Sequence, residues 1–314
     1  KRQGGNLTVY DPFGTVGAGA ATNVLLGAAS LNSQISSNPT PSVRTSNSIG
    51  WLSNDMSGFR AQVQYALSEV PAFCAAGDAR NTNAATTNYC GGQAGDGQTT
   101  GFRLQYNSGP LALAFASSKA TFGADTLAAT PATFILMGTG NQTAGGATIG
   151  TSTIYQAGAS RGSLTTTNLA GSYTVGALKL MAQLGQQAQA DAVGDTTINT
   201  GRKFNYTVLG AVYTQGALTY KASYVTGKRS ETQGAGATTN DDGSKTDQTA
   251  LGVVYDLSKR TAVYGTWASL KATSGNGAGA TGTLRATMGL NGNLLPAGQS
   301  ATATGIDLGI RHRF

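Results

Sequence analysis

The sequence predicts an all-β fold in which antiparallel strands span a membrane as a closed barrel. The 314 residues end in a stretch whose side chains alternate between apolar and small or charged. Stretches with the same alternation recur along most of the chain, and the connections between them are alternately long and short. This arrangement is typical of an outer-membrane barrel, which has short turns on the periplasmic side and long loops outside.

The C-terminal strand gives the clearest example of the pattern. In the last twelve residues, Ile306, Leu308 and Ile310 lie on one face of the expected strand, opposite Asp307. The chain then ends on Phe314 without a polar tail. Chain termini are usually polar and frayed. A strand that ends in this way indicates a sheet that needs its last strand, as a closed barrel does.

Eleven alternating stretches follow one another as hairpins. The expected strands are 43–51, 59–68, 102–107, 111–116, 168–175, 178–187, 204–212, 218–224, 251–255, 262–270 and 303–314. In the seventh stretch we place Phe204, Tyr206 and Val208 on the apolar face, toward lipid. The long loops are expected at 1–42, 70–100, 119–163, 229–244 and 273–301. A soluble β-sandwich gives no reason for all the long loops to lie at one end.

Composition excludes several classes of protein. Charged residues make up 11% and hydrophobic residues 39%, which suits neither a disordered chain nor a helical membrane protein. No run of about 18 apolar residues is present, so no membrane-spanning helix is expected. The formal charge is +7, but the basic residues are dispersed, so we expect no nucleic-acid partner. His312 is the lone histidine, and no metal-binding spacing or catalytic triad is present. We therefore expect no cofactor, no metal and no enzymatic activity.

The two cysteines, Cys74 and Cys90, lie in one polar stretch of the 70–100 loop. Their spacing fits no metal site. We expect a disulfide that closes a local loop, which would indicate an oxidising compartment and contribute about 3 kcal/mol. The alternative is a pair of free thiols.

Three motifs resemble the general-diffusion porins of beta-proteobacteria. Residues 258–265 (SKRTAVYG) are similar to the penultimate hairpin of that family, and 305–314 (GIDLGIRHRF) to its closing strand. Residues 9–14 (VYDPFG) resemble the loop that folds into the lumen and constricts it. The resemblance runs from about residue 1 to 314, although only these motifs are specific.

The resemblance implies a single barrel domain over 1–314, with 1–42 as the inward-folding constriction loop and 43–314 as strands and loops. Such porins are sixteen-stranded homotrimers of the Gram-negative outer membrane, in contact with lipid and lipopolysaccharide. Their terminal phenylalanine, here Phe314, serves the barrel-assembly machinery. Five strands precede the constriction loop in the family, and Lys1-Arg2-Gln3 looks like the end of the fifth. We therefore expect N-terminal strands to be absent from this sequence.

If the chain is a porin, as the resemblance implies, the polar faces of the strands line a water-filled channel. Eight basic residues and one acidic residue lie on the expected polar faces: Arg44, Arg60, Arg103, Lys179, Lys221, Lys271, Arg311, Arg313 and Asp307. Fixed positive charge in a narrow lumen concentrates anions and repels cations. We expect passive diffusion of small hydrophilic solutes, with small anionic solutes preferred. The alternative is that several of these charges lie at the rims, where salt screens them.

Arg44 and Asp11 are the sharpest candidates for the constriction. By resemblance, Arg44 matches a constriction arginine of anion-selective relatives, and Asp11 matches an acidic residue that faces such arginines. Arg2 is expected to join the same cluster. The alternatives are a rim arginine for Arg44 and a turn-initiating aspartate before Pro12 for Asp11.

Three other functions remain open. A substrate-specific channel of the same fold would show saturable solute binding. A soluble β-rich surface adhesin would need no detergent. An outer-membrane barrel enzyme would need a histidine and a nucleophile at the outer boundary, whereas His312 belongs to the periplasmic end.

Overall fold

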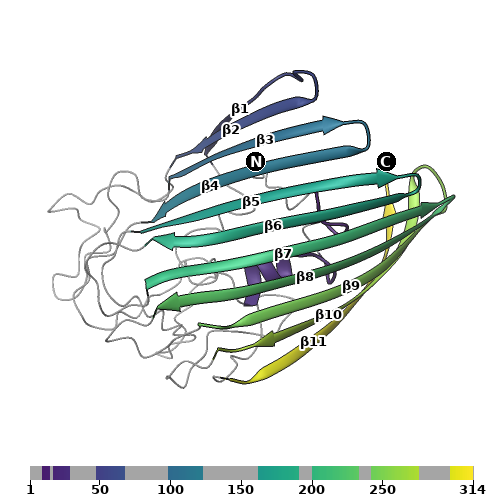
Figure 1. Ribbon diagram of the computed structural model, residues 1–314. Coiled ribbons are helices and arrows are strands. Elements are labelled where there is room, and N and C mark those ends of the chain that lie inside the picture. The colour runs from purple at the N-terminus through teal and green to yellow at the C-terminus, as the bar shows by residue number, and fades with distance from the viewer. Residues whose placement is uncertain are drawn as a thin grey trace, which may run out of the picture.

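The computed structural model describes residues 9–14, 17–28, 47–67, 98–122, 162–190, 200–232, 242–275 and 298–313. These form one antiparallel sheet of eleven strands, ordered as in the sequence (Figure 1). The predicted all-β, antiparallel architecture and the number of strands are confirmed. The strands are β1 (Ser48–Leu52), β2 (Phe59–Ala66), β3 (Thr99–Ser108), β4 (Leu111–Phe122), β5 (Gly162–Val175), β6 (Leu178–Ala190), β7 (Thr200–Gln215), β8 (Leu218–Thr232), β9 (Lys245–Asp256), β10 (Thr261–Thr273) and β11 (Ser300–His312).

The connections alternate between short and long. Two residues join β3 to β4, β5 to β6, and β7 to β8, whereas longer segments join β2 to β3, β4 to β5, and β10 to β11. The two-residue turns use Gly109, Gly176 and Gly216 with positive φ, a backbone conformation that hairpin turns require and glycine adopts without strain. The strand ends joined by short turns therefore lie at one end of the sheet, which we call the turn side, and the strand ends joined by longer connections lie at the other, which we call the loop side.

Several strands are longer than the alternation predicts. β5 begins at Gly162 rather than 168, and β8 continues to Thr232 although the sequence led us to place a loop over 229–244. These extensions are rich in Thr, Ser, Gly and charged residues, so they show no apolar face. Their backbone pairing does not need one, because the ladder hydrogen bonds come from the main chain.

The sheet is curved, and the segment that precedes β1 lies against its concave face. We call the described residues 9–14 and 17–28 the inner segment. It ends in a short π-type helix, η2 (Asn23–Ala28). Figure 1 shows this helix on the concave side of β7 and β8. We call the sheet face that contacts the inner segment the inner face and the opposite one the outer face.

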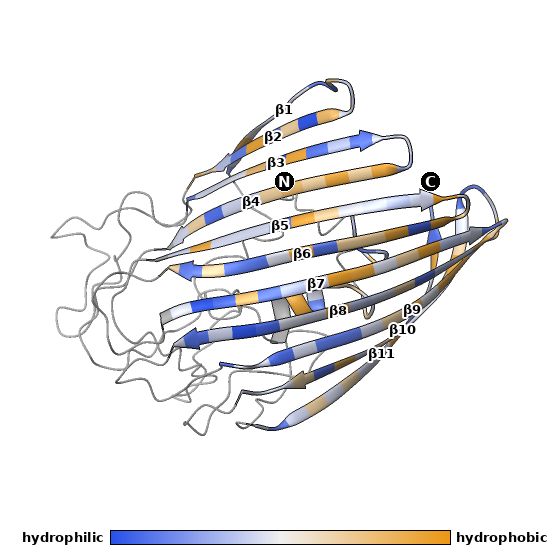
Figure 2. Cartoon of the chain, in the orientation of Figure 1, coloured by the Kyte–Doolittle hydropathy of each residue, from blue (hydrophilic) through white to orange (hydrophobic). Residues whose placement is uncertain are grey.

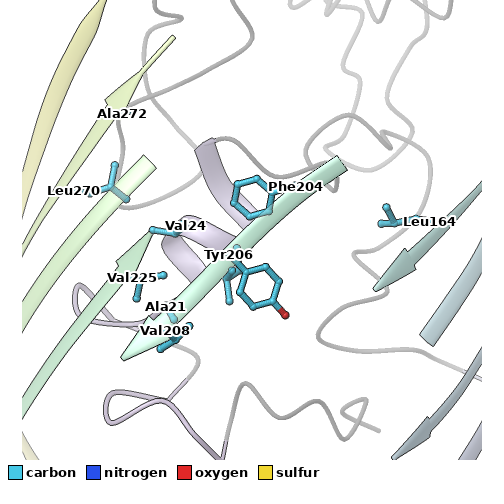
Figure 3. Close-up of a cluster of buried hydrophobic side chains, with 10 residues drawn as sticks. Ala21, Val24, Leu164, Phe204, Tyr206, Val208, Val225, Leu270 and Ala272 are labelled. Atoms are coloured by element: carbon cyan, nitrogen blue, oxygen red, sulfur yellow. The ribbon is translucent and has the colours of Figure 1, made fainter. Parts of the chain in front are cut away.

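The prediction for the seventh strand is wrong. Phe204, Tyr206 and Val208 of β7 are buried on the inner face, whereas Leu209 and Tyr213 lie on the outer face. The three buried side chains belong to a cluster that includes Ala21, Val24 and Leu25 of the inner segment, with Val225 of β8 and Leu270 of β10 (Figure 3). Both faces of β7 carry apolar residues, so alternation alone could not identify the face toward lipid.

The outer face presents large apolar side chains to its surroundings. Ile306, Leu308 and Ile310 of β11 are 68%, 80% and 72% exposed. Figure 2 shows apolar residues over the middle and turn-side parts of β4, β6 and β7, and hydrophilic residues at the loop-side ends of β6 to β9. An apolar surface this large is unusual for a protein in water and fits contact with lipid. None of the described helices is long and apolar enough to cross a membrane.

Lys271 is also placed wrongly by the sequence. Its neighbours Leu270 and Ala272 are fully buried on the inner face, so Lys271 is on the outer face of β10. It lies directly opposite Asp247 of β9.

Candidate functional site: the inner segment and the charges around it

Asp11 closes the inner segment into a compact loop. Its two carboxylate oxygens accept hydrogen bonds from the backbone N–H groups of Phe13, at 3.0 Å, and Ala21, at 2.7 Å. Because Phe13 and Ala21 are eight residues apart, one buried side chain holds both ends of the loop. The structure therefore gives Asp11 a role in shaping the inner segment.

Burial raises the pKa of the Asp11 carboxyl to about 6. The two backbone donors and the charge of Lys221 lower this pKa, but they offset only part of the desolvation. The Asp11 carboxyl therefore titrates near neutral pH, where its charge can respond to ordinary changes of medium.

Side chains from four strands fasten the inner segment to the wall. Lys221 of β8 donates from Nζ to the backbone oxygen of Pro12, at 2.8 Å. Gln248 of β9 donates to the backbone oxygens of Gly19 and Ala20, both at 3.1 Å. The remaining two are Gln187 of β6, which donates to the backbone oxygen of Leu25 at 3.2 Å, and Asp307 of β11, which accepts from the backbone N–H of Ala18 at 2.6 Å.

Glycines of the wall make room for the rings of the segment. A Cβ at Gly252 of β9 would lie 2.7 Å from the Phe13 ring, and one at Gly210 of β7 would lie 2.6 Å from the Pro12 ring. The Phe13 ring also faces the ammonium of Lys221, which lies 5.9 Å from its centroid. A larger residue at either glycine would push the inner segment away from the wall.

Tyr10 is fully buried where the segment meets β4 and β5. Its side chain packs on Ala114 and Ala170. Burial raises the pKa of Tyr10, and the neighbouring guanidinium of Arg103 partly offsets that rise. Arg103 thus sits on the inner face beside the segment.

The inner face carries both signs of charge, with basic residues in excess. The charged residues on this face, among the described strand residues, are Arg60, Arg103, Lys179, Arg202, Lys221, Arg229 and Arg311, with Glu231, Asp256 and Asp307 as the acidic ones. Arg229 and Glu231 form a buried ion pair at 2.6 Å, and Arg311 lies 3.8 Å from Asp256. Glu231 and Asp256, which the sequence did not lead us to expect there, offset part of this positive charge, and the expected Lys271 lies on the outer face instead.

The structure brings part of the predicted site together. Asp11, Lys221 and Arg103 lie at or beside the inner segment, and Asp307 holds it from β11. Three other predicted residues stand apart from the segment's contacts: Arg60 beside Asp55 near a short turn, Lys179 at the turn-side end of β6, and Arg313 just beyond β11. Arg311, at the turn-side end of β11, does not contact the segment but is close enough for its charge to act on Lys221. Arg2, Arg44, Cys74, Cys90 and Phe314 lie outside the described residues.

Sequence reasoning missed the glutamines that fasten the segment. Gln187 and Gln248 are almost fully buried, at 1% and 0% exposure. The alternation in the expected strand 178–187 placed Gln187 on the polar face with Lys179 and Gln183. It did not indicate which group Gln187 contacts. Gln248 lies before the stretch expected as the ninth strand, so no pattern pointed to it.

Comparison with solved structures finds other outer-membrane proteins. The anion-selective porin from Comamonas acidovorans matches with 24% identity and a TM-score of 0.63, over 98% of this chain and 70% of that one. OmpT, an outer-membrane protein of Vibrio cholerae, matches in its trimer form with 11% identity and a TM-score of 0.51, over 89% of this chain and 67% of that one. At these identities the likeness shows a shared fold.

A comparison with curated protein sequences gave no match. A family model described as Gram-negative porin matches residues 3–276, most of the sequence. The antiparallel sheet, its apolar outer face and the segment fastened to its inner face agree with that match. The chain belongs to the Gram-negative porin family.

Proposed function

We propose that this protein forms a water-filled channel through which small hydrophilic solutes diffuse passively, with anions preferred. Gram-negative porins are channels of the outer membrane, and membership of the family places this chain there. The observation that carries the proposal is the inner segment, which lies across the concave face and is flanked by Arg103 and Lys221. The segment acts as the constriction of the channel.

Fixed charge at a constriction acts strongly on passing ions. Narrow openings with walls of low dielectric constant focus the field, so basic side chains there raise the local anion concentration. Arg103 is half-buried beside Tyr10, and Lys221 is held against Pro12. Charges fixed in this way are screened less by salt than charges at an open rim. Two basic groups at the narrowest part support the anion preference.

We also propose that the protein assembles as a homotrimer. The trimer form of OmpT shares the fold, and the resemblance to general-diffusion porins implies the same assembly. The disulfide between Cys74 and Cys90, the recognition of Phe314 by the assembly machinery and the pairing of Arg44 with Asp11 stay predictions.

Planar-bilayer recording under a salt gradient tests the channel and its selectivity. The wild-type protein should give a reversal potential of the sign expected for anions. R103Q should lower the ratio of anion to cation permeability severalfold, because it removes charge next to the inner segment. R60Q is the matched control: Arg60 is also on the inner face but is 50% exposed and pairs with Asp55, so its removal should change the ratio less.

Three results would contradict parts of the proposal. A cation-selective wild-type channel would overturn the anion preference. If R103Q and R60Q changed the ratio of anion to cation permeability equally, the charges beside the inner segment would not be what sets the selectivity. Solute flux that saturates at low concentration would favour a substrate-specific channel over general diffusion.

A further inference from the structure

Four lysines form a row across the outer face at the loop-side ends of β7 to β10. Lys203, Lys228, Lys245 and Lys271 are all exposed, and each lies on the outer face of its strand. Lys228 pairs directly with Lys245 across β8 and β9. Lys203 pairs with Ser230 and Lys271 with Asp247, which places each of them diagonally next to another lysine. We call these four residues the lysine row.

The row has more positive charge than its neighbours neutralise. Like charges directly opposite each other on paired strands are destabilising. Asp247 is the one acidic residue on the outer face of these four strands within the described part of the chain. Its carboxylate lies 3.0 Å from Lys245 Nζ and also accepts hydrogen bonds from Tyr224 and Thr226. An anion from outside would relieve the repulsion that remains between Lys228 and Lys245.

The row stands at the height of the outer membrane boundary. Lys228 follows Leu218, at the turn side of β8, by ten residues, and Lys245 precedes Tyr255 of β9 by the same number. Ten residues at about 3.3 Å each, in strands tilted by about 40°, rise about 25 Å, the usual height of the apolar band of such a barrel. Figure 2 shows the change from apolar to hydrophilic residues toward these strand ends.

We propose that the lysine row binds the phosphate groups of a phosphorylated glycolipid in the outer leaflet. Lysine is a common phosphate ligand, and basic clusters at a membrane boundary attract anionic headgroups. Three strand spacings of about 4.8 Å make the row about 14 Å wide, enough for a headgroup with more than one phosphate. Below the row, outer-face residues such as Leu209 and Leu251 offer an apolar surface for the acyl chains. The inference rests on the outer-membrane location and is independent of pore selectivity.

Binding of purified lipopolysaccharide to the full-length protein in neutral detergent tests the inference. The double variant K228Q/K245Q should bind about tenfold more weakly than the wild type. K119Q is the matched control, because Lys119 is also exposed at the loop-side end of the outer face of β4 but pairs with Thr100 and Thr165. K119Q should change binding less than about twofold.

Two further binding measurements test whether the lysine row recognises the phosphate groups of the lipid. Dephosphorylated lipopolysaccharide should bind the wild type as weakly as intact lipopolysaccharide binds the double variant, and millimolar inorganic phosphate should not displace the intact lipid. Without lipopolysaccharide, K228Q should unfold at a higher temperature than the wild type because it removes the repulsion.

Unchanged single-channel conductance in K228Q/K245Q would show that the lipid site and the channel are separate. Wild-type binding by the double variant, or an equal loss in K119Q, would overturn the inference. So would a change in the oligomeric size of the double variant on a native gel, because the row would then be a contact between copies of the chain.

Discussion

At the scale of single residues, Asp11 joins local structure to channel function. Its carboxylate accepts two backbone hydrogen bonds that shape the inner segment, and Lys221 lies nearby and holds Pro12. Burial places the pKa of this carboxyl at about 6. Above that pH the ionised carboxylate opposes the positive charge of Lys221 and Arg103. Below it the neutral carboxyl leaves those charges unopposed.

We expect acidification to strengthen the anion preference of the wild type. Between pH 7.5 and pH 5 the Asp11 carboxyl takes up a proton, so the reversal potential in a salt gradient should move further toward the anion limit. D11N should already show the stronger preference at pH 7.5 and change little with pH. An amide keeps one acceptor oxygen, so the lost hydrogen bond should cost about 1 kcal/mol and leave the fold intact.

D256N serves as the control for this experiment. The Asp256 carboxylate is also on the inner face but is half-exposed, at the turn-side end of β9. This variant should keep the pH response of the wild type. If D11N kept that response as well, the titrating group would have to be a different one.

At the scale of elements, β8 shows how a strand continues without an apolar face. Its loop-side end carries Arg229 and Glu231, whose side chains are 3% and 1% exposed and form an ion pair. The backbone N–H of Glu231 also donates to Asp242, which lies just before β9. Buried charge is tolerated here because the two groups neutralise each other. The hydrogen bond from Glu231 to Asp242 therefore ties the end of β8 to the residues that precede β9.

Removal of one partner of this pair should be costly. E231Q leaves the Arg229 guanidinium buried without its carboxylate, and we expect a loss of about 3 kcal/mol in the free energy of unfolding. D55N breaks the Arg60–Asp55 pair, in which both side chains are about half exposed, and should cost at most about 1 kcal/mol. Urea unfolding in lipid vesicles measures both. Similar losses in the two variants would show that burial does not decide the strength of these pairs.

At the scale of the whole molecule, the outer face divides into an apolar band and a polar loop-side margin. Leu308 is 80% exposed within the band, between Ile306 and Ile310. Ser300 lies on the same face of β11, at its loop-side end opposite Thr273. On β11, therefore, Leu308 is expected in the hydrocarbon layer and Ser300 is expected at the membrane boundary.

We expect L308R to destabilise the protein in a bilayer far more than S300R. Arginine in the hydrocarbon layer costs about 2–4 kcal/mol in transmembrane barrels, and at the boundary about 0–1 kcal/mol. The difference in folding free energy in phospholipid vesicles measures this gradient. Equal costs at the two positions would place the membrane boundary elsewhere on the sheet.

Alternation along single strands predicted much of the fold. It located eleven strands, and the short and long connections gave their antiparallel order. It also put Arg103, Lys221 and Asp307 on the same face of the sheet as the inner segment. These features follow from the two-residue period of a strand, which a sequence shows directly. The alternation did not predict strand ends such as 162–167 and 226–232, because main-chain hydrogen bonds form there without an alternating pattern of side-chain polarity.

Only the tertiary structure decided which apolar residues face lipid and which face the protein's own interior. Phe204, Tyr206 and Val208 resemble lipid-facing residues in sequence, yet they cover the inner segment. Lys271 resembles a pore charge, yet it lies on the outer face opposite Asp247. The sequence by itself determined the periodicity of each strand, and therefore which residues share a face. The choice between inside and outside depends on contacts between distant parts of the chain, because an apolar side chain gains as much from a folded-in segment as from lipid.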